Sequence, residues 1–167
     1  MPKKFPKRAS SQLTKKLQAI LPNYDDTANK ELVAVVDTNV YISALLGSST
    51  ASNALSAIYR QCDIIISQQI IDELCRFIDD NWKKARGLKK LAREVLAERA
   101  TLFIDADQLD DIWLGDLRDK NDGHIVKACI STNADVLITG DKDLLVLGSI
   151  GRTAVITMND FLGLLGT

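Results

Sequence analysis

The chain has 167 residues, of which 46% are hydrophobic and 26% charged, proportions typical of a globular domain. No apolar run approaches the ~20 residues of a membrane-spanning helix, and no apolar segment of the kind found in secretory signals follows the N-terminal lysines. The three cysteines, Cys62, Cys75 and Cys129, are far apart and match no zinc-binding spacing. We therefore expect reduced thiols, no membrane association and a cytoplasmic protein.

The formal net charge of −1 conceals an uneven distribution, because residues 1–30 hold seven of the 21 basic residues and only two of the 22 acidic ones. We expect residues 1–30 to be a basic N-terminal extension, partly disordered or folded into a short amphipathic helix that Pro22 ends. Residues 31–167 then form one domain. The basic extension binds the phosphate backbone of a nucleic acid, serves as a solubilising tail, or contacts only a partner chain.

Several short apolar segments without polar alternation predict strands buried on both faces. They cover residues 32–37, 63–66, 102–104, 135–138 and 154–157. Segments with apolar residues three and four apart predict the helices. These cover residues 40–46, 53–60, 68–78, 88–99, 121–130, 142–147 and 158–165, with a polar loop over 48–52. Alternation of strands and helices predicts an α/β fold: a parallel sheet with helices on both faces, hence three layers.

Four carboxylates are expected to meet at one edge of this sheet. Asp37 and Asp141 follow the strands that end near residues 36 and 138, while Glu73 and Asp122 lie in the first turns of helices that start at the same edge. Each acid alone could simply cap a helix. Four acids at one edge repel one another unless a cation neutralises them, and oxygen ligands without histidine or cysteine favour Mg²⁺ or Mn²⁺. Metal-assisted phosphodiester hydrolysis is the natural chemistry of such a site.

Four motifs, taken in order, resemble those of the PIN-domain family. They are Val35–Val40 with Asp37, Ile71–Leu74 with Glu73, Asp119–Asp122, and Thr139–Leu145 with Asp141. The resemblance spans about residues 32–163 and is greatest to the single-domain prokaryotic branch of VapC-like toxins from toxin–antitoxin systems.

This resemblance implies a five-stranded parallel sheet and a Mg²⁺- or Mn²⁺-dependent ribonuclease. In such an enzyme Asp37, Glu73 and Asp122 would hold the metal and act in catalysis, with Asp141 completing the site directly or through water. Residues that would orient the carboxylates and the water are Thr38, Asn39 and Thr139.

Some positions near these motifs have more than one interpretation. Asp119 could replace Asp122 if the match is displaced by one helical turn, and Arg118 and Lys120 either contact RNA phosphate or are solvated. His124, the only histidine, could donate to a phosphate near the site, but a surface position is expected.

The resemblance also implies partners: an RNA substrate, a cognate antitoxin protein and a second copy of the chain in a homodimer or larger homo-oligomer. A non-catalytic PIN fold that binds RNA or supports assembly is the alternative function. Phosphotransfer through Asp37 is disfavoured, because dehalogenase-like phosphatases need an aspartate where this chain has Asn39.

Overall fold

The structure is a computed structural model that describes residues 32–82, 87, 89–90, 92–93, 96, 102–104, 117 and 120–165. The predicted N-terminal extension lies outside the described residues, and the predicted helix over 88–99 is described only in part. Within this part of the chain, no helix is both long enough and apolar enough to cross a membrane.

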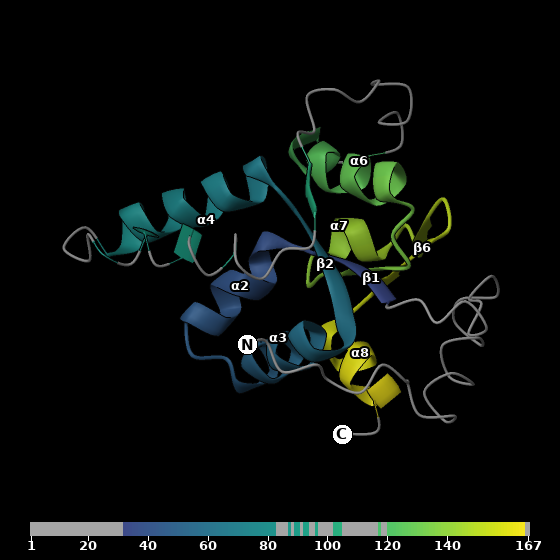
Figure 1. The fold of residues 1–167 in the computed structure, drawn as a ribbon, viewed down its shortest axis with the longest axis horizontal. Coiled ribbons are helices and arrows are strands. Elements are labelled where there is room, and N and C mark those ends of the chain that lie inside the picture. Colours follow the sequence, from purple (N-terminus) through teal and green to yellow (C-terminus); the bar gives the residue numbers. More distant parts are fainter. Residues whose placement is uncertain are drawn as a thin grey trace, which may run out of the picture.

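One six-stranded sheet forms the centre of the fold (Figure 1). In spatial order its strands are β3 (Leu102–Ile104), β2 (Cys62–Ser67), β1 (Leu32–Val36), β4 (Val136–Ile138), β6 (Thr153–Ile156) and β5 (Ser149–Ile150). The first five strands are parallel, while β5 pairs antiparallel with β6. The five predicted parallel strands are therefore confirmed.

The expectation of an entirely parallel, five-stranded sheet was wrong at one edge. Strand β5 adds a sixth, antiparallel strand of two residues. Gly148 and Gly151 flank it with positive φ angles of 67° and 58°, a backbone conformation that glycine adopts without steric cost. A two-residue strand is too short to leave a periodic pattern in the sequence.

The helices whose bounds the structure describes are α2 (Thr38–Leu45), α3 (Ser49–Gln61), α4 (Gln68–Asn81), the 3₁₀ turn η4 (Lys120–Asp122), α6 (Gly123–Thr132), α7 (Lys142–Leu145) and α8 (Met158–Leu165). Five of these, α2, α3, α4, α7 and α8, follow residues whose side chains satisfy free backbone N–H groups. Ser67 caps α4 by accepting from the Ile70 N–H at 3.3 Å. Thr157 and Asp160 cap α8 reciprocally, as predicted for Thr157.

The predicted loop over 48–52 was wrong, because α3 already begins at Ser49. The Ser48 hydroxyl accepts a hydrogen bond from the Ala51 N–H at 3.2 Å and so caps the helix. Ala51, Ala54 and Ala57 face the core from α3. Small alanines extend the apolar side of the helix by a turn without being conspicuous in the sequence.

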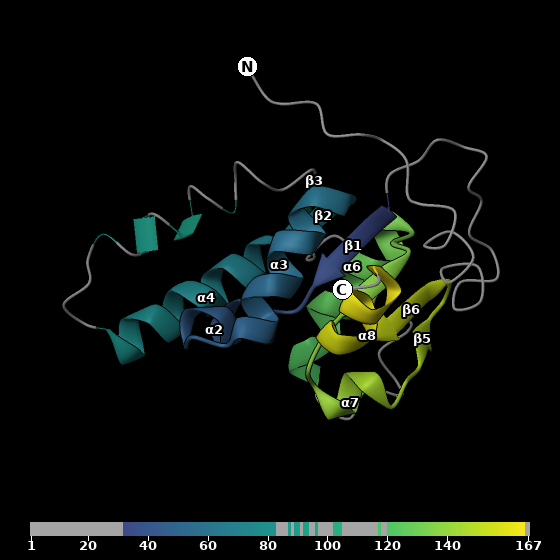
Figure 2. The ribbon, with the colours of Figure 1, turned by 90° about the horizontal axis from the view of Figure 1, so that it is seen from below.

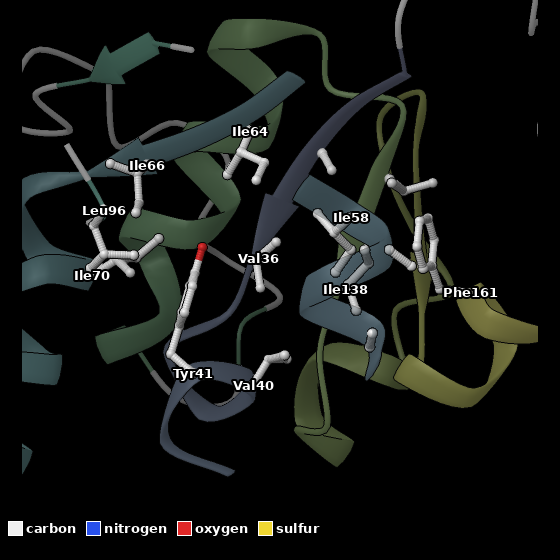
Figure 3. Packing of buried hydrophobic residues seen from close by; sticks show 14 of the residues in the cluster. Val36, Val40, Tyr41, Ile58, Ile64, Ile66, Ile70, Leu96, Ile138 and Phe161 are labelled. Atoms are coloured by element: carbon white, nitrogen blue, oxygen red, sulfur yellow. The ribbon is translucent and has the colours of Figure 1, made fainter. Parts of the chain in front are cut away.

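Two apolar clusters lie against the sheet, and β1 contributes to both. Ala34 and Val36 belong to the larger cluster with residues of α3, α4 and α8, whereas Val35 belongs to a smaller cluster with residues of α6 and α7. Figure 3 shows Val36 packed among Ile58, Ile138 and other members of the larger cluster. Figure 1 shows α6 on one side of the sheet and α3 and α8 on the other.

A partly buried ionic contact joins the strands at the end opposite to the carboxyl end of β1. Asp135, which precedes β4, is 4% exposed. It accepts hydrogen bonds from the Val33 N–H and from Arg152 Nη2, both at 2.9 Å. This aspartate therefore ties β1 to β4 and to the turn between β5 and β6.

Replacement of Asp135 by alanine should lower the free energy of unfolding by about 2–3 kcal/mol, because it removes charge-assisted hydrogen bonds and leaves a buried N–H without an acceptor. Urea denaturation of wild type and variant measures the difference. The control is Asp79→Ala, which breaks an exposed pair with Lys89 and should change stability by less than about 1 kcal/mol. Equal losses of unfolding free energy in the two variants would show that the Asp135 contacts stabilise the fold no more than an exposed ion pair does.

Candidate active site

The candidate site is built around Asp37, the residue that follows β1 and caps α2. Its backbone N–H extends the strand pairing by donating to the Ile138 carbonyl at 3.0 Å. One carboxylate oxygen, Oδ1, accepts from the Asn39 N–H at 3.3 Å, and the other, Oδ2, accepts from Thr139 Oγ1 at 2.6 Å. Because the side chain is only 3% exposed, these bonds fix its orientation at the end of the strand.

The Asp37 carboxyl has an unfavourable electrostatic environment. Burial raises its pKa above the ordinary value, and the nearby Asp141 raises it further, while the hydrogen bonds from Thr139 and Asn39 act in the opposite direction. Desolvation is the largest of these effects. A cation beside Asp37 would stabilise its ionised form.

Asp141 is held at the end of the neighbouring strand by the same threonine. Its backbone N–H donates to Thr139 Oγ1 at 2.9 Å, and its Oδ1 accepts from the Asp143 N–H at 2.8 Å, which caps α7. The buried Thr139 hydroxyl therefore donates to one acid and accepts from the backbone of the other. The structure brings Asp37 and Asp141 together, as the strand order predicts.

Glu73 reaches the site from α4. Its Oε2 accepts a hydrogen bond from Thr38 Oγ1 at 2.6 Å, and Thr38 directly follows Asp37. The glutamate side chain is 34% exposed. This bond places the glutamate next to Thr38, the first residue of α2, directly after Asp37.

Asp122 stands at the junction of η4 and α6, where its side chain makes no capping hydrogen bond. Two residues later, His124 Nε2 lies 3.6 Å from Glu73 Oε1. The start of α6 therefore approaches α4 on the side where Glu73 lies. Figure 2 shows these elements from a second direction, with α6 near the end of β1.

The expectation of a surface position for His124 was wrong. Its side chain is only 9% exposed, and its Nδ1 lies 2.8 Å from the Asn121 carbonyl. Ala128, four residues later and therefore on the same helical face, is fully buried. The spacing of four residues between His124 and Ala128 was therefore an indication in the sequence that His124 could be buried.

The predicted RNA-contacting residues are not characterised by the structure. Arg118 and Asp119 lie outside the described residues, and Lys120 is described only as the first residue of η4.

The donor set fits a hard divalent cation such as Mg²⁺ or Mn²⁺, because it consists of carboxylates around a buried aspartate whose pKa is raised by desolvation. Among the residues that the structure describes, no three Asp, Glu, His or Cys side chains form a group able to enclose an ion. Water and phosphate oxygens would complete the coordination of such an ion, as is usual for Mg²⁺.

Comparison with known proteins identifies the family. Residues 33–143 match the PIN domain, so the chain belongs to the PIN-domain family. Among solved structures, a chain of VapBC2 from Rickettsia felis, bound to a DNA fragment from their promoter, has a similar fold with a TM-score of 0.56. The two chains share 20% sequence identity over 75% of this chain and 98% of the other. A comparison with curated proteins gave no match.

We expect Asp37→Asn to stabilise the fold at neutral pH without divalent ions. The pKa of Asp37 is raised in the folded chain above its value of about 4 in the unfolded chain. As pH rises from about 4 through the raised pKa, this group therefore lowers the free energy of unfolding. The asparagine variant has no carboxyl to ionise at this position, so it lacks this pH-dependent loss of stability. Its amide oxygen can still accept the hydrogen bond that caps α2.

Urea unfolding in EDTA from pH 4 to 8 measures the effect. The variant should gain stability over wild type as pH rises, and the difference should vanish near pH 4. Asp72→Asn, an exposed acid on α4, serves as the control and should give a curve parallel to wild type. A parallel curve for Asp37→Asn as well would contradict the role of burial.

Proposed function

We propose that this protein is a metal-dependent endoribonuclease that hydrolyses RNA phosphodiester bonds and acts as the toxin of a toxin–antitoxin system. The observation that carries the proposal is the buried Asp37 carboxylate, oriented by the Thr139 hydroxyl beside Asp141. A protein that used this fold only for assembly would gain stability by losing that carboxylate. Membership of the PIN-domain family, whose known members include nucleases, supports the same conclusion.

In the proposed enzyme, Asp37, Glu73, Asp122 and Asp141 hold Mg²⁺ or Mn²⁺. The bound ion supplies Lewis-acid activation of water and stabilises negative charge at the scissile phosphate. The chain itself positions the ligands: Thr139 and Asn39 orient Asp37, and Thr38 orients Glu73. Such hydrogen bonds restrict carboxylate rotation and increase the affinity of a metal site.

The same carboxylates would repel the phosphate backbone if no cation were bound. Metal binding and substrate binding are therefore coupled in this proposal, since the ion neutralises the acids before a polyanion approaches. Arg118 and Lys120, which flank the third motif in the sequence, are proposed to contact RNA phosphates.

A cognate antitoxin protein is the proposed partner, and the VapBC2 complex from Rickettsia felis, named as bound to promoter DNA, supports this choice. We also propose that the protein acts in the cytoplasm as a homodimer or larger homo-oligomer.

Purified protein should cleave single-stranded RNA with Mg²⁺ or Mn²⁺, and Asp37→Asn or Asp122→Asn should reduce the rate by at least about two orders of magnitude, because each removes charge at the metal. Gel analysis of a labelled RNA measures cleavage. Glu73→Gln tests the third ligand, with Asp72→Asn as its matched control one residue earlier on α4. No cleavage by wild type with either ion would favour the alternative of a non-catalytic RNA-binding or assembly module.

Toxicity is tested separately from chemistry. Induced expression of the chain in a bacterial host should slow growth, and Asp37→Asn should restore it at equal protein levels, because the active site causes the damage. Co-expression of the protein encoded by the adjacent gene should also restore growth if it is the antitoxin. Equal growth inhibition by wild type and Asp37→Asn would refute the toxin role while leaving nuclease activity to the previous experiment.

A further inference from the structure

One buried polar atom near the site has no hydrogen-bond partner among the residues that the structure describes, and it has no part in the proposed ligand set. His124 Nε2 is inaccessible to solvent and makes no hydrogen bond. Its nearest acidic neighbour is Glu73 Oε1, at 3.6 Å. A buried polar atom left in this way costs free energy and needs an explanation.

The hydrogen bond at the other ring nitrogen defines what Nε2 can do. Nδ1 lies 2.8 Å from the Asn121 carbonyl oxygen, which carries no hydrogen, so Nδ1–H is the donor. In the neutral ring Nε2 then has no proton and presents a lone pair. Donation from one ring nitrogen to a backbone carbonyl is the usual arrangement of a metal-binding histidine, because it fixes the tautomer and the ring orientation.

Glu73 presents a matching oxygen. Its Oε2 is bound by Thr38 Oγ1, and this bond leaves Oε1 on the side of His124. In the octahedral coordination usual for these ions, two adjacent ligand atoms that are each about 2.1 Å from the ion lie about 3.0 Å apart, which is shorter than the observed 3.6 Å. A small rotation of the half-exposed glutamate closes the difference. Two lone pairs this close repel each other unless a cation lies between them.

We infer that His124 Nε2 is a nitrogen ligand that, together with Glu73, makes the metal centre favour a first-row transition ion such as Mn²⁺ over Mg²⁺. The inference rests on the proposed metal-dependent function. Imidazole nitrogen binds transition ions well, whereas Mg²⁺ strongly prefers oxygen. Water and substrate phosphate would supply the positions that the protein ligands leave open.

The single histidine in the chain makes a direct test possible. Full-length protein without a histidine tag, labelled with ¹⁵N-histidine, contains the label at His124 alone. With bound Mn²⁺ as the probe, pulsed electron paramagnetic resonance should show nitrogen coupling that changes from ¹⁴N to ¹⁵N on labelling. Bound Mn²⁺ without histidine nitrogen coupling would overturn the inference, because an ion pair between His124 and Glu73 would then explain their proximity.

Affinity provides the second measurement. His124→Asn retains an amide that can donate to the Asn121 carbonyl but removes Nε2. Calorimetric titration should show Mn²⁺ affinity reduced at least about tenfold, with Mg²⁺ affinity nearly unchanged. Equal losses for both ions, or no loss for either, would overturn the inference, and Asp72→Asn is the control for charge on α4. RNA cleavage with Mg²⁺ is scored independently, so failure of this inference is distinguishable from failure of the proposed nuclease.

Discussion

The hydrogen bond between the Thr139 hydroxyl and the Asp37 carboxylate is the interaction on which the candidate site depends. It exists because β1 and β4 are parallel neighbours, paired through Val36 and Ile138, so the residues that follow them emerge side by side. The same hydroxyl accepts from the Asp141 backbone. One buried threonine therefore sets the relative positions of two acids that are over a hundred residues apart in sequence.

Burial of the Asp37 carboxylate in this arrangement lowers the stability of the fold. The strand that delivers Asp37 is apolar on both faces, so the carboxylate is surrounded by groups that solvate charge poorly, and its pKa is raised. The fold tolerates the cost because the two apolar clusters stabilise the strand on which Asp37 sits. Sites of this kind trade stability for function, and a bound cation would recover part of the loss.

Much of the architecture was predictable from the sequence, since buried parallel strands are unbroken apolar runs and Asp37 and Asp141 follow two of them. Glu73 and Asp122 were predicted from their places in the first turns of helices that start at the same edge, and the family resemblance implied the same residues, whose proposed roles remain predictions. Features that depend on a few atoms were not predictable. Strand β5 is too short to form a pattern, and α3 begins among small polar residues that also suit a loop. His124 was misjudged because its burial depends on α4 approaching α6, a contact between elements distant in sequence.

Two aspartates on either side of β4 show why residue type alone does not define a site. Asp135 and Asp141 both flank the strand, yet Asp135 is saturated by the Val33 N–H and by the Arg152 guanidinium, so its charge is neutralised within the fold. Asp141 lies near a second carboxylate, that of Asp37, whose pKa is raised chiefly by burial and to a smaller extent by Asp141. An acid whose charge is already compensated holds strands together, whereas a pair left uncompensated requires a cation. The carboxyl end of the sheet is therefore the end where chemistry is expected.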